Sequence, residues 1–503
     1  MKLGELLERV QPVESEVDQK IEVTSLAYDS RRVDKGCVFF AIQGEKTDGH
    51  LFVEDAIQRG AAAIVSEREA PVRLAAHWVR VRKIRRALSV AARRFYDDPD
   101  LKLQLIGITG TNGKTTTSYL LNSIFEAEAI RTGILGTVEY RLGGRTVPAL
   151  NTTPESLDLA GYLHELAASG AGSAILEVSS HALAQERVWG FRFSVAVFTN
   201  LTRDHLDYHR DFEHYFWAKQ KLFEGLGTPP PDLAVINVDD TWSRRLLAIP
   251  NPRRITYGME SRADVGVKRY SQNLAGISAT LTTPVGELEI ETALMGRVNL
   301  MNVLAATATA VGVGIPADKI QLGLRRLTAV PGRFEKVDEG QPFLVVVDYA
   351  HTDDALRNVL QTARELSGKR LLVVFGCGGE RDRTKRPLMG EVAGRMSDLA
   401  ILTSDNPRSE DPILIMNDVL VGLQRTGMSY IAEVDREMAI RRALAEAREG
   451  DIVVVAGKGH ESYQVLKDRT ISFDDREVAR RVLHDMGFRN APTDESGSGI
   501  VAG

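Results

Sequence analysis

Short apolar runs rich in β-branched residues recur along the chain, and each run ends in glycine or polar residues. Residues 105–109 (LIGIT), 173–180 (SAILEVSS), 343–351 (FLVVVDYAH) and 451–461 (DIVVVAGKGHE) are examples. Helix-like stretches separate the runs, which is the βαβ pattern of a parallel sheet. Ligands of open parallel sheets bind beyond the carboxyl ends of the strands. The pattern therefore predicts an α/β fold with functional residues at the strand ends, although polar loop ends also occur without function.

The length of the chain and the shifts in its pattern suggest several domains. At roughly 100–200 residues per domain, about three domains are expected. A linker is predicted at residues 97–104 (DDPDLKLQ), and an antiparallel-looking segment follows at residues 264–294. Leu3, Leu6, Leu7 and Val10 are spaced as in an amphipathic helix. We expect an N-terminal domain over 1–97, a central domain over 98–332, a C-terminal domain over 333–490 and a disordered tail over 491–503.

Composition excludes several classes of protein. The net charge is −5, and acids and bases are mixed, so no basic stripe suggests a nucleic-acid partner. No apolar run is long enough to cross a membrane, and the N-terminus lacks the apolar core of a signal peptide. Two cysteines, Cys37 and Cys377, cannot form a disulfide framework. We therefore expect a cytoplasmic protein without a nucleic-acid or membrane partner. We also expect a monomer that acts on small molecules.

Residues 107–117 (GITGTNGKTTT) have the features of a phosphate-binding loop. The loop is short, because it lacks the glycine that the usual template places five residues before its Gly-Lys pair. Lys114 adds a positive charge, the following helix directs its dipole at the anion, and Thr115 has the position that holds Mg²⁺. The expected nucleotide contacts are Gly110, Thr111, Asn112, Gly113, Lys114, Thr115 and Thr116.

A lysine lies on the apolar stripe of the helix predicted over residues 212–223. Lys219 shares that stripe with Phe212, Tyr215, Phe216, Leu222 and Phe223. A protonated amine is costly there, because burial disfavours the charged form. Lys219 could extend to the surface, pair with an acid, or add CO₂ as a neutral amine and become a carbamate that binds Mg²⁺. The stripe alone leaves these three possibilities open.

Several motifs, in order, resemble those of the Mur ligases, ATP-dependent enzymes that form the amide bonds of the peptidoglycan peptide. They are TGTNGKTT (109–116), EVSSHAL (177–183), NLTRDHLDYH (200–209), YFWAKQKLF (215–223), GRVNLMN (296–302) and DYAHT (348–352). The resemblance extends from about residue 22 to about residue 485. The members that add the third peptide residue share DSRRV (29–33), NTTPES (151–156), GCGGERD (376–382), DNPR (405–408) and GKGHE (457–461). One departure is Asp353, where the family usually has proline.

The resemblance implies an architecture and a reaction. An N-terminal domain would bind the UDP end of the substrate, a central P-loop-type domain with a parallel sheet would bind ATP, and a Rossmann-like C-terminal domain would bind the amino acid. A glutamyl carboxylate would take the γ-phosphoryl group of ATP, and an amine would then displace phosphate from the acyl phosphate. Cations must neutralise the two anions of the first step. The resemblance also implies that Lys219 is carbamylated.

The implied metal and ATP residues come from both sides of a domain boundary. The implied Mg²⁺ ligands are Thr115, Glu177, His205 and carbamylated Lys219. Without the resemblance, Glu177 could be a paired buried acid and His205 a histidine at the sheet rim. The resemblance places Asn299 and Asn302 on the adenine side, and it makes Arg333, Asp348 and His351 close over ATP, although these three could serve only as interdomain hydrogen-bonding groups.

Hydroxyl groups and one guanidinium make up the implied site for the UDP-muramoyl dipeptide. They suit a sugar pyrophosphate and a peptide carboxylate. Several could instead be helix caps, and Thr153 precedes Pro154-Glu155 as such a cap would. The implied contacts are Tyr28, Ser30, Glu45, Lys46, Thr47, Asn151, Thr152, Thr153, Ser179, Gln185 and Arg187.

The resemblance implies that meso-diaminopimelate is the added amino acid, because family members that add it carry the arginine of DNPR and lysine-adding members generally do not. Arg408 can form a bidentate contact with the distal carboxylate, whereas it would repel the ammonium of lysine. Arg381 would hold the other carboxylate, and Gly457 and Glu461 the distal ammonium. Arg408 could instead pair with Glu410 or Asp411. The implied amino-acid contacts are Arg381, Asp405, Asn406, Pro407, Arg408, Gly457 and Glu461.

Other functions remain as alternatives. The same ligase could add L-lysine, or the chain could resemble a folylpolyglutamate synthase, which would need neither DSRRV nor DNPR. A nucleotide-binding scaffold without turnover would not need Lys114, Glu177, His205 and Lys219. A phosphotransferase or GTPase would need a longer loop, and a GTPase would need a guanine-reading NKxD motif.

Overall fold

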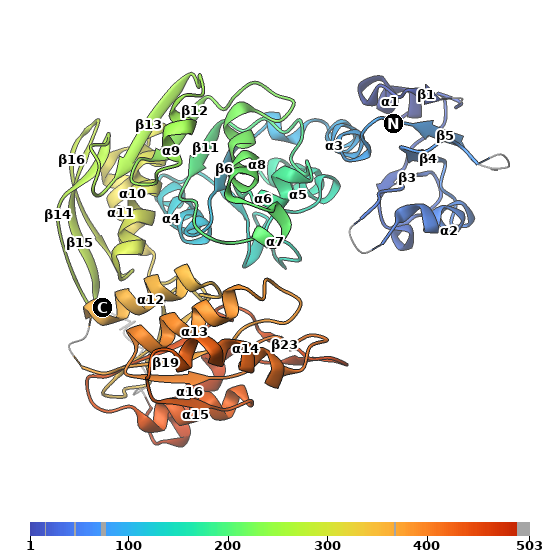
Figure 1. Cartoon of the computed structure of the whole chain (residues 1–503). Coiled ribbons are helices and arrows are strands. Elements are labelled where there is room, and N and C mark those ends of the chain that lie inside the picture. The colour runs from blue at the N-terminus through green and yellow to red at the C-terminus, as the bar shows by residue number, and fades with distance from the viewer. Residues whose placement is uncertain (16, 45–46, 72–76, 367–368, 490–503) are drawn as a thin grey trace, which may run out of the picture.

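The computed structural model describes residues 1–15, 17–44, 47–71, 77–366 and 369–489 (Figure 1). The predicted disordered tail and the candidate residues Glu45 and Lys46 lie outside the described residues. Among the described residues, none of the helices combines the length and the apolar character that a membrane span requires.

The N-terminal sheet has five strands in the order β1-β5-β4-β3-β2, and only β1 runs antiparallel to its neighbour. The predicted amphipathic helix is confirmed as α1, with Leu3, Leu6 and Leu7 buried. The strands are β1 (Glu14–Ser15), β2 (Ser25–Ala27), β3 (Cys37–Phe40), β4 (Ala63–Ser66) and β5 (His77–Arg80). The helices are α1 (Leu3–Val10), η1 (Ser30–Arg32), η2 (Gly49–Phe52), α2 (Val53–Gln58) and α3 (Ile84–Phe95).

Helix α3 joins the N-terminal sheet to the central one. Its buried face includes Leu88 and packs against both α1 and α5. Leu6 of α1, Leu88 of α3 and Leu163 of α5 belong to one continuous apolar cluster. Burial of such a cluster is favourable roughly in proportion to the apolar area removed from water. The N-terminal unit is therefore fixed to the central unit through a shared core.

The central sheet has eleven strands in the order β16-β15-β14-β13-β12-β11-β6-β10-β7-β8-β9. It is parallel from β14 to β7, and the hairpins at both edges are antiparallel. The antiparallel segment predicted at 264–294 is thus confirmed. The strands are β6 (Gln104–Thr109), β7 (Thr132–Leu135), β8 (Glu139–Arg141), β9 (Thr146–Pro148), β10 (Ser173–Glu177), β11 (Val195–Phe198), β12 (Leu233–Asn237), β13 (Arg253–Gly258), β14 (Val265–Asn273), β15 (Gly276–Thr283) and β16 (Gly286–Thr292).

Helices cover both faces of the central sheet. Helices α4, α10 and α11 share one apolar cluster, whereas α5 and α8 belong to the other. The predicted linker 97–104 is wrong at its end, because η3 forms within it and Gln104 already starts β6. The helices are η3 (Pro99–Leu101), α4 (Lys114–Ala127), α5 (Ser156–Ala168), α6 (Ser180–Ala184), α7 (Leu206–His209), α8 (Phe212–Glu224), α9 (Ser243–Leu247), α10 (Arg297–Gly312) and α11 (Ala317–Arg326).

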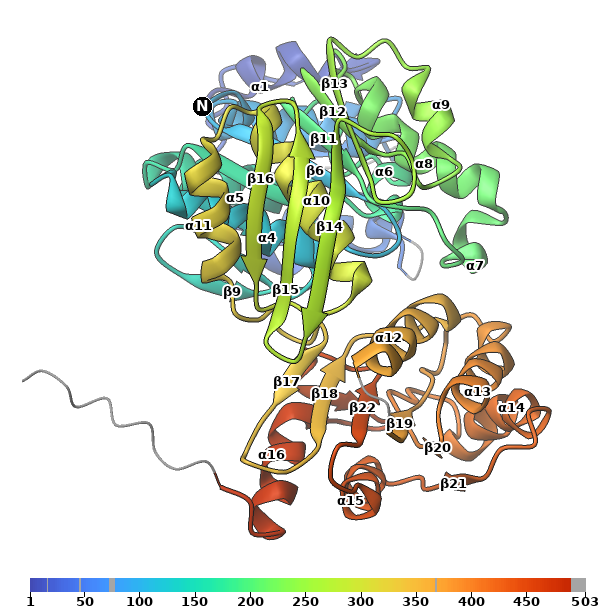
Figure 2. The same cartoon turned by 90° about the vertical axis from the view of Figure 1, so that its left-hand side faces the viewer.

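The C-terminal sheet has six strands in the order β17-β18-β22-β19-β20-β21, and only β17 is antiparallel to its neighbour. Helices α12, α13 and α14 cover one face, and α15 and α16 cover the other (Figure 2). The strands are β17 (Glu335–Val337), β18 (Leu344–Asp348), β19 (Leu371–Phe375), β20 (Leu399–Leu402), β21 (Tyr430–Ala432), β22 (Ile452–Ala456) and the hairpin β23 (Tyr463–Val465) and β24 (Thr470–Ser472). The helices are α12 (Asp353–Leu366), α13 (Lys385–Met396), α14 (Pro412–Gln424), α15 (Arg436–Glu446) and α16 (Asp475–Asp485).

These sheets occupy separate stretches of the chain, and the C-terminal unit lies against the end of the central unit (Figure 1). The fold is therefore α/β with mostly parallel sheets, as the alternating pattern predicts. We retain 1–97, 98–332 and 333–490 as proposed domain boundaries.

Candidate active site

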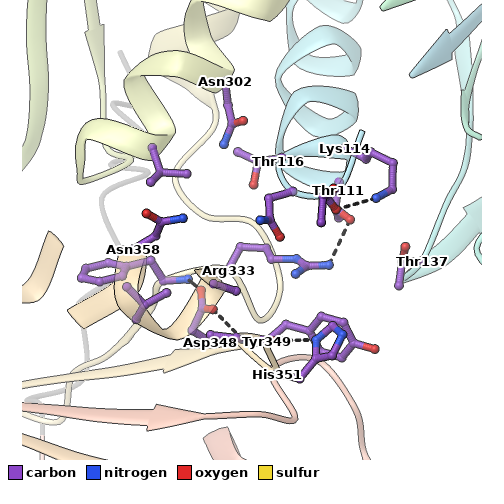
Figure 3. A pocket seen from close by; sticks show the side chains of 18 of the residues that line it. Thr111, Lys114, Thr116, Thr137, Asn302, Arg333, Asp348, Tyr349, His351 and Asn358 are labelled. Carbon is purple, nitrogen blue, oxygen red and sulfur yellow. Dashed lines mark hydrogen bonds between the residues drawn. The ribbon is translucent and has the colours of Figure 1, made fainter. Parts of the chain in front are cut away.

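A cavity of about 230 Å³ lies where the central and C-terminal units meet (Figure 3). The loop after β6, the ends of β10 and β11, and helix α10 line it from the central unit. The loop after β18 and helix α12 line it from the C-terminal unit. The predicted residues on its wall are Thr111, Asn112, Gly113, Lys114, Thr115, Thr116, Thr152, Glu177, Ser179, His205, Asn299, Asn302, Arg333, Asp348 and His351.

The strand–loop–helix context predicted for the phosphate loop is confirmed, because β6 leads through the loop into α4. Gly110 (φ 151°) and Gly113 (φ 88°) have positive φ angles that favour glycine. A Cβ atom on Gly110 would lie 1.8 Å from Thr199 Oγ1. Lys114 Nζ donates to the carbonyl oxygens of Gly110 (3.0 Å) and Thr111 (2.9 Å). Burial lowers the pKa of Lys114, and the nearby Glu177 carboxylate opposes that shift.

Glu177 is a buried carboxylate at the end of β10, with 1% of its surface exposed. It accepts hydrogen bonds from Thr115 Oγ1 (3.0 Å), from the Thr137 amide (3.0 Å) and from Thr137 Oγ1 (2.9 Å). Within the described ranges it forms no salt bridge, so the alternative of a paired buried acid is wrong. A buried anion needs compensation, and carboxylate oxygens are ligands that Mg²⁺ prefers. This carboxylate can therefore bind a cation in the cavity.

His205 follows β11 and lines the same cavity. Its Nε2 lies 3.2 Å from Asp204 Oδ2, and its ring centroid is 4.6 Å from that of His181. Burial lowers the pKa of His205 to about 3, while the Asp204 carboxylate opposes the shift. A neutral imidazole is the form that binds metals.

Lys219 lies in α8 with 1% of its surface exposed, so it does not extend to the surface. Its Nζ donates to the Gly110 carbonyl oxygen (2.8 Å) and lies 4.5 Å from the centroid of the Tyr215 ring. No acid pairs with it in the described part of the chain. Burial, and then the charge of Lys114, hold the pKa of Lys219 well below its usual value. Of the three possibilities, carbamylation of the amine remains, and Lys219 lies behind the phosphate loop and is not among the residues that line the cavity.

The predicted stripe on α8 is wrong at its first position. Phe212 is 37% exposed and stacks against Trp242, with ring centroids 6.5 Å apart. The other predicted members, Tyr215, Phe216, Leu222 and Phe223, are buried. Phe212 is the first residue of the helix, where the neighbouring chain leaves it partly open to solvent.

Among the described residues, no group of three or more His, Cys, Asp or Glu is arranged to hold a metal ion. The predicted ligand set has only two members of those types, Glu177 and His205. Both line the cavity together with Thr115. Binding of Mg²⁺ by this set would therefore also need the Thr115 hydroxyl oxygen and the proposed carbamate on Lys219.

The residues predicted on the adenine side form a short hydrogen-bonded chain. Asn302 Nδ2 donates to Asn299 Oδ1 (3.1 Å), and Asn299 Nδ2 donates to the Met295 carbonyl oxygen (2.8 Å). Asn302 Oδ1 also lies close to Gly113, where a Cβ atom would be 2.4 Å away. Helix α10 is therefore in close contact with the phosphate loop.

Residues of the C-terminal unit reach the phosphate loop directly. Arg333 Nη2 donates to Thr115 Oγ1 (3.1 Å), and Asp354 Oδ2 accepts from Asn112 Nδ2 (3.0 Å). Asp348 instead fixes its own loop, because it accepts from the amides of Phe334 (2.7 Å) and Ala350 (2.8 Å). Burial raises the pKa of Asp348.

Sequence patterns miss several residues that line the cavity. Tyr349 and Asp204 lie within the motifs DYAHT and NLTRDHLDYH, but only other residues of these motifs are predicted site residues. Thr137 and Asn358 belong to no motif, and no spacing signal identifies them.

The residues predicted to contact the UDP-linked substrate are spread over two places. Thr152 and Ser179 line the cavity already described, whereas Gln185 lines a second cavity of about 340 Å³ between the N-terminal and central units. Arg187 Nη1 donates to the Thr153 carbonyl oxygen (3.0 Å), and Tyr28 Oη donates to Asp158 Oδ2 (2.5 Å).

The remaining UDP-side candidates differ in exposure. Ser30 is buried, whereas Thr47 is exposed. The carbonyl oxygen of Asn151 accepts from Tyr140 Oη (2.5 Å).

The cap predicted for Thr153 is wrong. Glu155 is the N-cap of α5, and Thr153 is fully buried. Thr153 Oγ1 donates to the Glu177 carbonyl oxygen (2.8 Å), so a tertiary contact replaces the local one. Ser179 does cap a helix, because its side chain accepts from the Ala182 amide at the start of α6.

The predicted amino-acid contacts lie together at the carboxyl ends of β19, β20 and β22. Arg408 Nη1 donates to the Gly379 carbonyl oxygen (2.8 Å), and its pairing with Glu410 or Asp411 is wrong. Glu410 pairs with Arg386 instead, and Asp411 caps α14.

Charged groups of both signs surround Tyr463 in this region. Burial raises the pKa of Tyr463, as do Glu461 and Asp405, while Arg408 and Arg381 oppose the shift. Asn406 Nδ2 donates to Glu461 Oε2 (2.8 Å). Gly457 (φ 121°) leaves no room for a side chain, because a Cβ atom would lie 2.6 Å from Asp405 Oδ2.

Three family models match successive parts of the chain. "Mur ligase family, catalytic domain" matches residues 22–96, "Mur ligase middle domain" matches residues 108–310, and "Mur ligase, glutamate ligase domain" matches residues 332–459.

Individual relatives agree with these models. The chain is 55% identical to UDP-N-acetylmuramoyl-L-alanyl-D-glutamate--2,6-diaminopimelate ligase of Solibacter usitatus (strain Ellin6076), with 97% of this chain and 99% of the relative covered. A solved structure of a ligase of the same name is 35% identical, covers 97% of this chain and 100% of its own, and has a TM-score of 0.69. The MurF ligase of Thermotoga maritima in complex with ADP is 18% identical, with a TM-score of 0.60 and coverage of 93% and 97%, and it supports the fold alone. The chain belongs to the Mur ligase family.

Proposed function

We propose that this ATP-dependent ligase joins meso-diaminopimelate to UDP-N-acetylmuramoyl-L-alanyl-D-glutamate, releasing ADP and phosphate, in the synthesis of peptidoglycan precursors. The observation that carries the proposal is the shared cavity. It brings Lys114, Glu177 and His205 of the central unit next to Arg333 and His351 of the C-terminal unit. The similarity to the Solibacter ligase over nearly the whole chain supports the choice of substrates.

The residues around the phosphate loop suit phosphoryl transfer to a carboxylate. Lys114 and the N-terminus of α4 place positive charge where the phosphates of ATP would bind. Arg333 adds a guanidinium from the C-terminal unit and contacts Thr115 Oγ1. These charges offset the repulsion between the substrate carboxylate and the γ-phosphate. Closure of the two units around the cavity excludes water from the acyl phosphate.

The residues present fit Mg²⁺, because Glu177 is a buried carboxylate that lacks a cationic partner among the described residues. Thr115, Glu177 and His205 would hold the ion, with a carbamate on Lys219 as a further oxygen ligand. Mg²⁺ would supply Lewis-acid stabilisation of the phosphoryl oxygens. Lys219 is suited to the modification, because only a neutral amine adds CO₂ and burial disfavours the charged form of this amine.

The C-terminal unit would select the amino acid. Arg381 and Arg408 are the cations for its carboxylates, and Glu461 is the acid for its distal ammonium. A second carboxylate distinguishes diaminopimelate from lysine, and Arg408 would bind it with charge-assisted hydrogen bonds.

One assay tests the proposed function. Purified protein is incubated with ATP, Mg²⁺ and the UDP-muramoyl dipeptide, and each candidate amino acid is added separately. We expect phosphate release and amide formation with meso-diaminopimelate. Turnover with L-lysine alone would favour the lysine-adding ligase, turnover with a folate and glutamate would favour the folylpolyglutamate synthase, and phosphate release without any amine would favour a simple NTPase.

Replacement of Arg408 by alanine should lower kcat/KM for meso-diaminopimelate by at least about 10-fold, because a charged hydrogen bond contributes about 1.5–3 kcal/mol. The KM for ATP should stay the same, because Arg408 is not on the wall of the ATP cavity. Steady-state kinetics with varied amino acid measure the effect. Arg425→Ala, at the exposed end of α14, is the matched control. Unchanged kinetics in Arg408→Ala would reject the assignment.

A further inference from the structure

A completely buried lysine lies in the loop that follows β22. Lys458 has no exposed surface, and no step of the proposed reaction uses it. Its ammonium group carries three N–H donors and no acceptor. The donors meet the Tyr463 carbonyl oxygen (2.5 Å), Glu461 Oε2 (3.2 Å) and Asn406 Oδ1 (3.3 Å). A buried charge is costly unless it is paired and hydrogen-bonded, so these three groups hold the ammonium in one place.

The side chain of Asn406, in the DNPR motif, is occupied by the protein itself. Its Oδ1 accepts from the Val465 amide (2.9 Å) as well as from Lys458, and its Nδ2 donates to Glu461 Oε2 (2.8 Å). A carbonyl oxygen has two lone pairs, and both are used here. Asn406 Oδ1 is therefore not available to an ammonium group of the substrate.

The hairpin of β23 and β24 fixes the DNPR loop next to this lysine. The Arg408 amide donates to the Val465 carbonyl oxygen (3.1 Å), and Gln464 Nε2 donates to the Asp405 carbonyl oxygen (2.6 Å). Lys458 contacts the hairpin at Tyr463 and the DNPR loop at Asn406. It therefore joins the hairpin, the DNPR loop and Glu461 at a single point.

The two carboxylate oxygens of Glu461 have different surroundings. Oε2 accepts from both Asn406 and Lys458, whereas Oε1 accepts no hydrogen bond from the residues that the structure describes. The Glu461 side chain is 16% exposed, and that of Lys458 is not exposed at all. Oε1 is therefore the oxygen that a substrate ammonium can reach.

Lys458 supplies the positive charge beside Glu461. Burial raises the pKa of Glu461, and the Lys458 ammonium opposes that shift, while the Asp405 carboxylate adds to it. Arg436 lies nearby, but its guanidinium is engaged in a buried bidentate ion pair with Asp475 (2.8 and 2.7 Å). Within the described ranges, Lys458 is the only cation that forms an ion pair with Glu461.

We propose that Lys458 is a positioning residue for recognition of the distal ammonium of the added amino acid. It fixes Glu461 Oε2, keeps the carboxylate charged, and leaves Oε1 to accept the ammonium. The substrate carboxylates are assigned to Arg381 and Arg408, so Lys458 acts on the ammonium alone. This inference rests on the proposed function and deepens it, because it names the residue that stands behind the acid of the site.

A competition between two amino acids tests the role of Lys458. L-2-aminopimelate keeps the reacting amine and both carboxylates of meso-diaminopimelate but lacks the distal amine. Both are offered together with ATP, Mg²⁺ and the UDP-muramoyl dipeptide, and mass spectrometry quantifies the two amide products. The product ratio gives the ratio of kcat/KM values, whatever fraction of the protein is active. For the unmodified protein we expect a preference for meso-diaminopimelate of about 10-fold or more, the value of a charged hydrogen bond.

Removal of the lysine charge should abolish this preference. In Lys458→Met, the ratio should fall to about 2 or less, because burial disfavours a carboxylate that has lost its cation. The kcat/KM for L-2-aminopimelate alone should stay within about twofold, because its contacts are independent of the lysine. Lys458→Gln also lacks the charge and should give the same loss. Lys467→Met, at the exposed turn between β23 and β24, is the matched control and should keep the full preference.

The outcomes separate the inference from the proposed function. An unmodified protein that forms no amide with meso-diaminopimelate contradicts the proposed function. An unmodified protein that forms the amide but has no preference over L-2-aminopimelate overturns the inference alone. So does a preference that survives in Lys458→Met. An equal loss of activity with both amino acids, or failure of both Lys458 variants to show cooperative thermal unfolding, assigns Lys458 to stability and overturns its role in recognition, as does loss of preference in Lys467→Met.

Discussion

Replacement of Lys114 by alanine will reduce ATP-dependent amide formation by about 100- to 1000-fold, the effect of removing one electrostatic group from a preorganised site. Lys114 is the lysine of the phosphate loop, and it lines the cavity together with Glu177. The fold should tolerate the change, because the Gly110 carbonyl oxygen keeps the hydrogen bond from Lys219. Phosphate release measures the activity, and thermal unfolding measures the stability.

A matched control for Lys114→Ala is Lys102→Ala. Lys102 is exposed and pairs with Asp97, far from the cavity wall. Its replacement should leave turnover within about twofold, because exposed ion pairs contribute about 1 kcal/mol or less. If Lys114→Ala turned over at the unmodified rate, the phosphate-loop assignment would be wrong.

Replacement of Lys219 by methionine will lower the rate by about 100-fold or more, because a metal-bound site contributes several kcal/mol to such a transition state. The free energy of unfolding should change by no more than about 1 kcal/mol, or should increase, because an apolar residue of similar size replaces a buried amine. Lys114 continues to donate to the Gly110 carbonyl oxygen. Activity and stability will therefore separate in this variant.

The carbamate that we propose on Lys219 would have a signature of its own. With ¹³C-labelled bicarbonate, the unmodified protein should show a carbamate carbon signal by NMR, and Lys219→Met should lack it. Lys221→Met, two residues further along α8, is the control that should keep both the signal and the activity. Full turnover by Lys219→Met would contradict the proposed role.

Local periodicity predicts much of this molecule. The β-branched runs become strands because their side chains are buried on both faces of parallel sheets. The burial of Lys219 follows from its place on the apolar stripe of α8, since a helix brings residues seven apart to the same side. Phe212 shows the limit of that reasoning. Its spacing places it on the apolar stripe, but spacing does not show whether another segment of the chain covers it.

Contacts between units are not predictable from local pattern. Arg333 meets Thr115, and Asp354 meets Asn112, although more than 200 residues separate the partners of each pair. Thr153 has the local pattern of a helix cap, and yet a tertiary hydrogen bond to the Glu177 carbonyl oxygen takes its hydroxyl. Thr137 belongs to no motif, although its amide and its hydroxyl both donate to Glu177.

The N-terminal and C-terminal units are attached to the central unit by different kinds of contact, and this difference affects which unit can move. The shared apolar core through α3 makes the N-terminal and central units one stiff body. The C-terminal unit is held mainly by hydrogen bonds such as those of Arg333, Asp354 and Arg203, with Met295 as an apolar contact. Water can replace hydrogen bonds at a small net cost, whereas exposing a core is expensive. We therefore expect the C-terminal unit to be the one that moves when substrate enters and product leaves, and we expect solvent viscosity to slow this motion.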